Sequence, residues 1–239
     1  MQWIRSLLLT VFLFVGTFVF TVAVIVSGLF PMEYRHATAR GWARTMLWAC
    51  RTFCGLDYVV EGAENIPREG AHISFWKHSS TWETMTQMLV FPPQAWVLKH
   101  EIMWIPFLGW AVGRLKPIAI NRGAGHRAVN QVVEQGIERL REGLWVLIFP
   151  EGTRVLPGQT RRYGISGALL ASKSGAKLVP VAHNAGDFWP RRGLLKRRGT
   201  IRVIVGPPIE AAGRDPREIN AEAQDWIEGR MREISRLYR

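Results

Sequence analysis

The sequence predicts an α/β domain that follows an apolar N-terminal segment. After residue 54, short apolar runs alternate with longer polar or amphipathic segments, the pattern of strands and helices in such a domain. The chain has 239 residues, enough for one hydrophobic core with an appendage. We therefore expect a membrane anchor with an amphipathic helix in residues 1–54, and one domain with a central mixed sheet flanked by helices in residues 55–239.

The anchor is predicted by Leu7–Phe30, a run without a charged side chain. As a helix this run would be roughly 36 Å long, enough to cross a bilayer. A cleaved signal peptide has a shorter apolar region that ends in small residues. Arginines at positions 35, 40, 44 and 51 follow the run and only Arg5 precedes it, which favours a domain on the cytoplasmic side. The sequence allows both a spanning and a re-entrant helix.

The arginines after the anchor belong to an amphipathic segment, Tyr34–Cys54, in which Trp42 and Trp48 are among the apolar residues. Tryptophan and arginine together favour an interfacial helix, whereas a helix packed on the domain would show the same pattern.

The elements of the domain follow from the apolar periodicity and the turn residues between runs. The expected strands are Tyr58–Glu61, His72–Trp76, Ala95–Leu98, Pro117–Ile120, Leu144–Phe149, Lys177–Ala182 and Thr200–Val205. The expected helices are Ser80–Leu89, Gly125–Arg141, Gly164–Ser174 and Pro216–Tyr238.

The net charge of +12 requires an acidic partner or surface. Nucleic acid and anionic lipid both meet this requirement, and the anchor favours lipid. We therefore expect anionic membrane lipids, and no nucleic acid, as partners. The densest basic run suits lipid headgroups or an acidic carrier protein, although an ordinary solvated loop has the same composition. It contains Arg191, Arg192, Lys196, Arg197 and Arg198.

His78 follows a predicted strand, and Glu83 lies five positions later near the start of a predicted helix. Open α/β sheets commonly bind ligands at such strand ends. If Ser79 or Ser80 caps the helix, the carboxylate can hold one imidazole nitrogen while the other faces the cleft as a base. A hydroxyl group needs such a base to attack a thioester. The spacing alone is weak evidence, because it also occurs by chance.

A second string, FPEGTR at Phe149–Arg154, also follows a predicted strand. The planar fork of an arginine pairs with phosphate oxygens, and a glycine permits close backbone approach. The two strings together predict an acyl-transfer site built around a histidine base. Other hydrolytic sites lack support, because no His-Glu-x-x-His string occurs and residues 164–167 do not form a Gly-x-Ser-x-Gly elbow.

One competing pattern is GAGHRA at residues 123–128, which follows a predicted strand and opens a helix, as a dinucleotide-binding turn does. However, Arg122 crowds the strand end, and the next strand leads into FPEGTR rather than to an isolated ribose-binding carboxylate. We therefore expect no dinucleotide.

Over nearly its whole length, the chain resembles the bacterial 1-acyl-sn-glycerol-3-phosphate acyltransferase family. The four ordered blocks of that family have counterparts in His78–Glu83, Lys116–Arg122, Phe149–Arg154 and Val179–Ala182. Two residues depart from the family pattern. Glu83 stands where Asp is commonest, and Asn121 stands where Asp is frequent.

The resemblance implies a glycerolipid acyltransferase-like fold and transfer of a fatty acyl group from acyl-CoA or acyl carrier protein to the sn-2 hydroxyl of lysophosphatidic acid. It implies that His78 is the base and that Glu83 orients it. The acceptor would be bound by Arg122, Glu151, Gly152, Thr153 and Arg154, with Lys116 as a further candidate.

No metal and no redox cofactor is expected. The resemblance places the protein at the bacterial inner membrane, with the catalytic domain facing the cytoplasm. Two alternatives stay open at this point. One is an acyltransferase for another lyso-lipid, such as a lyso-ornithine lipid or a lysophospholipid. The other is a non-catalytic membrane protein that binds anionic lipid.

Overall fold

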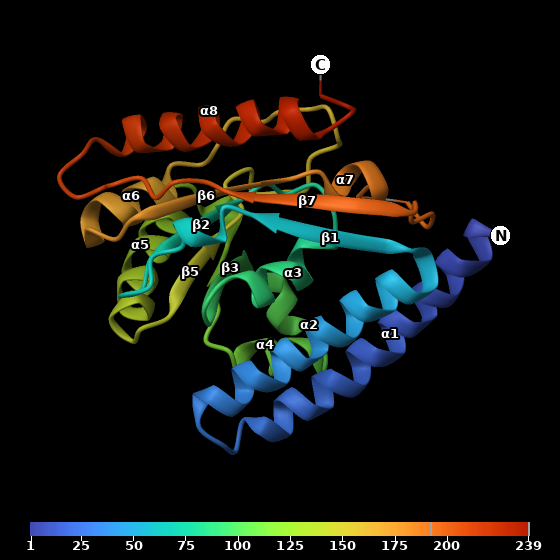
Figure 1. Ribbon diagram of the computed structural model, residues 1–239. Helices are drawn as coiled ribbons and strands as arrows, with labels where there is room; N and C mark the ends of the chain where they lie inside the picture. Colours follow the sequence, from blue (N-terminus) through green and yellow to red (C-terminus); the bar gives the residue numbers. More distant parts are fainter. Residues whose placement is uncertain (192, 239) are drawn as a thin grey trace.

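A seven-stranded mixed sheet forms the centre of the molecule (Figure 1). The computed structural model describes residues 1–191 and 193–238, without the side chain of Arg122. The strand order is β1-β7-β6-β2-β5-β3-β4. β6 and β7 pair antiparallel, and all other neighbours pair parallel. The strands are β1 (Leu56–Glu61), β2 (Ile73–Trp76), β3 (Gln94–Lys99), β4 (Ile118–Ile120), β5 (Trp145–Ile148), β6 (Leu178–His183) and β7 (Gly199–Val205).

Helices cover both faces of this sheet. α5, α6 and α8 pack with one face into one buried cluster, and α1, α2 and α3 pack with the other face into a second (Figure 1). The α-helices are α1 (Gln2–Ser27), α2 (Met32–Cys54), α3 (Glu83–Val90), α4 (Leu108–Gly113), α5 (His126–Arg141), α6 (Ser166–Ser174), α7 (Ala185–Phe188) and α8 (Pro216–Ile234). Short 3-10 helices are η1 (Ala63–Asn65), η2 (His100–Trp104) and η3 (Arg122–Ala124).

The expected fold class is confirmed, since the helix-flanked mixed sheet lies behind an apolar N-terminal helix. All seven expected strands are present with small differences at their ends. The last helix ends at Ile234 rather than at Tyr238, because the chain turns back and the Tyr238 hydroxyl donates to the Gln159 carbonyl. The expected helix from Ser80 begins at Glu83 and has no side-chain cap. The short helices α4 and α7 were not anticipated.

The amphipathic segment is α2, and it packs on the domain. Its buried residues include Ala39, Ala43, Met46 and Cys50, which pack in clusters with residues of α1, α3 and α4. Helix α1 runs beside α2 in the opposite direction (Figure 1). The N-terminal pair is therefore part of the folded unit.

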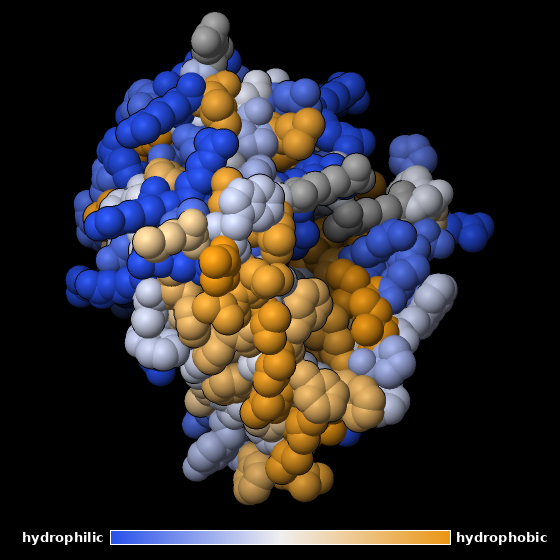
Figure 2. All heavy atoms as spheres, turned by 90° about the vertical axis from the view of Figure 1, so that its right-hand side faces the viewer, coloured by the Kyte–Doolittle hydropathy of each residue, from blue (hydrophilic) through white to orange (hydrophobic). Residues whose placement is uncertain are grey.

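Helix α1 leaves most of its apolar side chains uncovered. Within the described chain, it is the helix long and apolar enough to cross a membrane. Figure 2 shows apolar side chains gathered over the part of the surface where the N-terminal helices lie. The exposed residues of α1 include Leu7, Leu8, Val11, Phe14, Val15, Phe18, Val19, Val22 and Val26. Trp104, Ile105, Phe107 and Trp110 add exposed apolar side chains from η2, α4 and the turn between them, and the ring centres of Phe18 and Phe107 lie 5.7 Å apart.

Lys196 joins α1 to the domain, which corrects its expected place on a basic surface loop. Its backbone N–H donates to Ser6 Oγ (2.9 Å), and its ammonium donates to Thr10 Oγ1 (2.5 Å). The same ammonium lies 4.9 Å from the centre of the Trp189 ring. The side chain is buried and cannot meet lipid headgroups. Arg192 of the same run lies outside the described residues.

A tight helix–sheet contact yields a stability prediction. A Cβ atom added to Gly167 of α6 would lie 2.3 Å from the Phe75 ring and 2.8 Å from Ile148. We expect Gly167→Ala to lower the free energy of unfolding by about 1–3 kcal/mol through overpacking. Gly229 of α8 is the matched control, because a Cβ there meets nothing within 4 Å. Gly229→Ala should raise the stability by about 0.5–1 kcal/mol through helix propensity. Chemical unfolding in detergent measures both, and equal effects would contradict the packing argument.

Candidate active site

The imidazole of His78 is held from behind by a buried carboxylate. His78 follows β2, and its Nδ1 lies 2.9 Å from Glu83 Oε1, at the first residue of α3. An ionised carboxylate only accepts hydrogen bonds, so Nδ1 carries the proton and Nε2 keeps its lone pair. The ring also stacks on Phe149, with centroids 4.0 Å apart and planes 19° from parallel. These contacts leave Nε2 as the basic atom of the ring.

Glu83 stays charged although it is fully buried. Burial disfavours the carboxylate, but the hydrogen bond from His78, the neighbouring His183 and the Ser80 N–H outweigh that cost and lower its pKa. Besides the His78 ring, the backbone N–H groups of Ser79 and Ser80 donate to the same oxygen at 3.0 and 2.9 Å. The longer Glu side chain therefore folds back over the turn before the helix, where the family more often has Asp.

The backbone on either side of His78 is held as well. The His78 N–H donates to Glu151 Oε2 (2.6 Å), and the His78 carbonyl accepts from the Val155 N–H (2.8 Å). His183 is fully buried, as a core histidine should be, and its Nε2 lies 2.7 Å from the Lys77 carbonyl oxygen. The position of the imidazole is thus set by the FPEGTR turn and by β6 in addition to Glu83.

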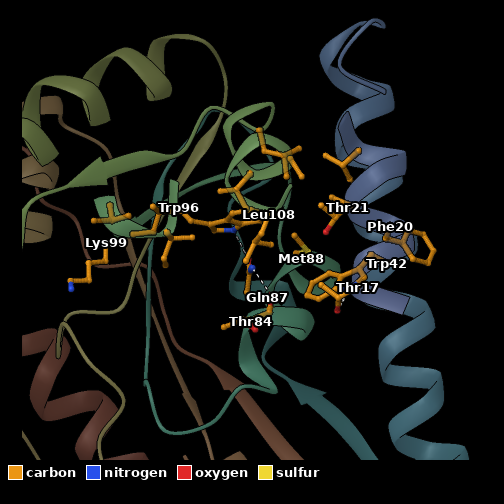
Figure 3. A pocket seen from close by; sticks show the side chains of 18 of the residues that line it. Thr17, Phe20, Thr21, Trp42, Thr84, Gln87, Met88, Trp96, Lys99 and Leu108 are labelled. Carbon is orange, nitrogen blue, oxygen red and sulfur yellow. Dashed lines mark hydrogen bonds between the residues drawn. The ribbon is translucent and has the colours of Figure 1, made fainter. Parts of the chain in front are cut away.

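An apolar cavity of about 350 Å³ lies between the N-terminal helices and the domain (Figure 3). His78 is one of the residues that line it. One wall comes from α1 and α2, with Thr17, Phe20, Thr21 and Trp42, and the opposite wall comes from the domain, with Met88, Trp96 and Leu108 (Figure 3). The lining reaches as far as Leu115, just before β4. His78, Phe149, Lys99 and Arg154 bring polar or aromatic groups to it. Such a cavity suits an aliphatic chain with a polar end at the histidine.

The FPEGTR turn contributes residues in different ways. Arg154 lines the cavity, and its Nε has no hydrogen-bond partner among the described residues. Glu151 is buried behind His78, paired with Lys77 (2.6 Å), and is not part of the cavity wall. Gly152 adopts φ +69°, a left-handed conformation that favours glycine. Thr153 is partly buried in the same turn.

Two further expected site residues come from the strand β4 block. Lys116 precedes β4 and so lies at the amino-terminal ends of the parallel strands, whereas His78 lies at their carboxyl ends. The Lys116 ammonium pairs with Glu142 (2.7 Å). This placement does not favour a part for Lys116 in phosphate binding, which stays a prediction from the sequence. The backbone of Arg122 follows β4, at the carboxyl ends of the parallel strands where His78 also lies. The side chain of Arg122 lies outside the described residues.

The structure adds residues that the motifs did not single out. Lys99 ends β3, lines the cavity, and pairs with the exposed Glu101 (2.8 Å). A basic residue at a strand end was its signal in the sequence. Lys77 and Glu228 lie behind the site and form a buried ion pair at 2.7 Å. No sequence signal pairs them, because they are far apart in the chain.

Comparison with known proteins shows which family the chain resembles. Residues 57–184 match the family model described as Acyltransferase. The chain is 41% identical to the 1-acyl-sn-glycerol-3-phosphate acyltransferase of Pseudomonas aeruginosa, over 98% of this chain and 93% of that protein. It is 24% identical to the human 1-acyl-sn-glycerol-3-phosphate acyltransferase alpha, over 88% of this chain and 75% of that protein.

The fold also matches a solved structure. The crystal structure of the 1-acyl-sn-glycerophosphate (LPA) acyltransferase from Thermotoga maritima superposes with a TM-score of 0.81 and 22% identity, covering 98% of this chain and 97% of that chain. The fold and the histidine site define an enzyme of acyl transfer. The chain belongs to the acyltransferase family.

The charge of Glu83 should make stability depend on pH. Because folding lowers the pKa of Glu83 from its usual 4.5, its charged form stabilises the fold above that value, and the contribution is lost as pH falls through the folded pKa. We expect Glu83→Gln to lower the unfolding free energy by about 1–3 kcal/mol at neutral pH, with a smaller difference from wild type well below pH 4.5. Chemical unfolding at both pH values tests this. Glu83→Asp, which keeps the charge, should retain the pH dependence, and a pH-independent Gln effect would refute the assignment.

Proposed function

We propose that this enzyme transfers a fatty acyl group from acyl-CoA or acyl carrier protein to the sn-2 hydroxyl of 1-acyl-sn-glycerol 3-phosphate, and so forms phosphatidic acid. The observation that carries the proposal is His78 at the polar end of an apolar cavity, with Nδ1 occupied by Glu83. The names of the relatives in Pseudomonas aeruginosa and in human support the same acceptor.

The reaction needs a base that becomes an acid. His78 Nε2 removes the proton of the sn-2 hydroxyl as the oxygen attacks the thioester carbonyl, and the ester C–O bond forms. Glu83 stabilises the imidazolium that results, because its carboxylate is charged and 2.9 Å from Nδ1. The tetrahedral intermediate then collapses, the C–S bond breaks, and the imidazolium returns the proton to the leaving thiolate.

The acceptor phosphate would be bound by the cations at the cavity. Among the described residues that line the cavity, Lys99 and Arg154 are the lysine and arginine side chains. Arg154 offers a planar fork to phosphate oxygens, and Lys99 offers a compact charge. Arg122 remains a proposed third contact, since its backbone lies at the carboxyl ends of the strands, as His78 does. Glu151, Gly152 and Thr153 would shape the turn that presents Arg154.

Both candidate donors are acidic and would be attracted by the basic surface near this turn. The Arg191 guanidinium donates to the Arg154 carbonyl oxygen (2.8 Å), so one residue of the basic run lies beside the site. Arg197 and Arg198 are close to Arg191 in sequence and are exposed. This arrangement supports a carrier thioester as donor and does not distinguish the two carriers.

The membrane would be met by the apolar surface of α1 together with η2 and α4. A bilayer would bury side chains that are otherwise exposed to water, including Phe14, Phe18, Trp104 and Trp110. The cavity lies between this surface and the domain, so a lipid acceptor could reach it from the membrane. We propose the bacterial inner membrane, with the domain on the cytoplasmic side and anionic lipids as partners.

His78→Ala should abolish acyl transfer while leaving the fold intact. Removing the base costs about 100- to 10,000-fold in rate. Phosphatidic acid formation is measured with detergent-solubilised protein, lysophosphatidic acid, and either acyl-CoA or acyl carrier protein thioester. His126→Ala, at an exposed position of α5, is the control and should keep wild-type activity. Turnover by His78→Ala at the wild-type rate would remove His78 from the mechanism, and the donor that supports turnover identifies the carrier.

Acceptor binding should depend on the two cavity cations. We expect Lys99→Met and Arg154→Gln each to raise the KM for lysophosphatidic acid by about 10- to 150-fold, the loss of one charged hydrogen bond. Lys116→Met removes a cation at the amino-terminal ends of the strands, away from His78, and should leave this KM unchanged. If a lyso-lipid without a phosphate monoester is used equally well by wild type and variants, the acceptor assignment is wrong.

A further inference from the structure

A buried group of charges lies directly behind the catalytic histidine. Lys77 has no exposed side-chain surface, and its ammonium lies 2.6 Å from Glu151 Oε1 and 2.7 Å from Glu228 Oε1. The Tyr163 hydroxyl donates to the same Glu228 oxygen (3.0 Å), and the ammonium lies 5.3 Å from the centre of the Tyr238 ring. The group therefore joins the end of β2, the FPEGTR turn, the loop before α6, and the C-terminal helix α8.

This group is an expensive way to hold the fold together. Burying charges removes them from water, and well-packed apolar side chains in their place are often as stabilising or more so. One ammonium also faces two carboxylates here, which leaves the group short of positive charge. Stability alone does not explain why these side chains are charged.

Glu151 connects the group to His78. Its Oε1 pairs with Lys77, and its Oε2 accepts the His78 N–H at 2.6 Å. A charged acceptor makes a hydrogen bond short and strong. When Glu151 is protonated, this acceptor weakens, and one constraint on the histidine backbone is lost. The position of His78 therefore depends on the charge of Glu151.

The neighbours of Glu151 act on its charge in opposite directions. Burial raises the pKa of Glu151 to about 7; Lys77 and the His78 N–H counteract this shift, and Glu228 adds to it. The facing titratable groups are Lys77 and His78 after β2, Tyr163 before α6, Glu228 on α8, and Tyr238 at the C-terminus. Burial also opposes the charge on Lys77, but attraction to Glu151, Tyr238 and Glu228 outweighs burial and raises the pKa of Lys77.

We propose that Lys77 and Glu228 are positioning residues for acyl transfer, which set the charge of Glu151 and through it the placement of His78. The proposal rests on the proposed function for its catalytic consequence. It makes the C-terminal helix α8 part of the catalytic apparatus, although α8 lies on the face of the sheet opposite to the N-terminal helices (Figure 1).

Two variants separate positioning from a purely structural role. Lys77→Met removes the cation and leaves Glu151 harder to ionise. Glu228→Gln removes the competing negative charge, keeps a similar shape, and makes Glu151 easier to ionise. The titration of Glu151 should therefore move to higher pH in Lys77→Met and to lower pH in Glu228→Gln, each by about one pH unit or more. A loss of packing has no reason to move it in opposite directions.

The titration is read from the backbone amide of His78. In protein labelled with ¹⁵N-histidine, the hydrogen-bonded amide proton of His78 should shift with pH as Glu151 ionises, and the His78→Asn variant assigns the signal. Activity gives a second readout. We expect Lys77→Met to lower kcat at neutral pH by about tenfold or more, with the KM for lysophosphatidic acid within about twofold of wild type. The acid limb of the kcat profile should follow the amide titration.

The controls are Lys116→Met and Glu142→Gln. They disrupt an exposed ion pair at the amino-terminal ends of the strands, away from His78, and should change neither readout. Unchanged amide titration and kcat in folded Lys77→Met and Glu228→Gln would overturn the proposal, as would lower stability without a pH shift. If Lys77→Met does not fold, Glu228→Gln decides alone through its downward shift. If the two variants move the amide titration in opposite directions but the wild type makes no phosphatidic acid, the charge coupling stands and the proposed function is refuted.

Discussion

The rest of the site depends on one buried carboxylate oxygen, Glu83 Oε1. It accepts hydrogen bonds from the His78 ring and from two backbone N–H groups, those of Ser79 and Ser80. These bonds keep the carboxylate charged without solvent, fix the tautomer of the imidazole, and shape the turn from β2 into α3. Glutamate can do this in place of the commoner aspartate because it is the first residue of the helix, so its extra methylene lets it fold back over the turn.

The imidazole is held in layers that come from distant parts of the chain. Phe149 stacks on its face, Glu151 holds its backbone N–H, and His183 holds the carbonyl of the preceding residue. Each support stands at or just after the carboxyl end of a parallel strand. A parallel sheet collects such ends on one edge, which explains how short motifs far apart in sequence form one site.

The N-terminal helices have two roles in this architecture. Their outer surface is apolar and exposed, and their inner surface forms one wall of the cavity beside His78. Lys196 reaches back to Ser6 and Thr10 and joins α1 to the domain, so the exposed apolar surface and the site belong to one folded unit. Under the proposed function, a lipid acceptor would enter the cavity between these helices and the domain.

The sequence by itself determined the α/β class, the seven strands, the apolar N-terminal helix and the pairing of His78 with Glu83, because these follow from local periodicity and short spacing. Only the tertiary structure decided that α2 packs on the domain, that Lys196 points inward, and that Lys77 contacts Glu228. It also placed Lys116 at the ends of the strands opposite to His78. A charged residue has the same one-letter signature on a surface and in a buried pair. Which of these it becomes depends on partners brought close by strand order and helix packing, and the burial that shifts pKa values arises only when those layers come together.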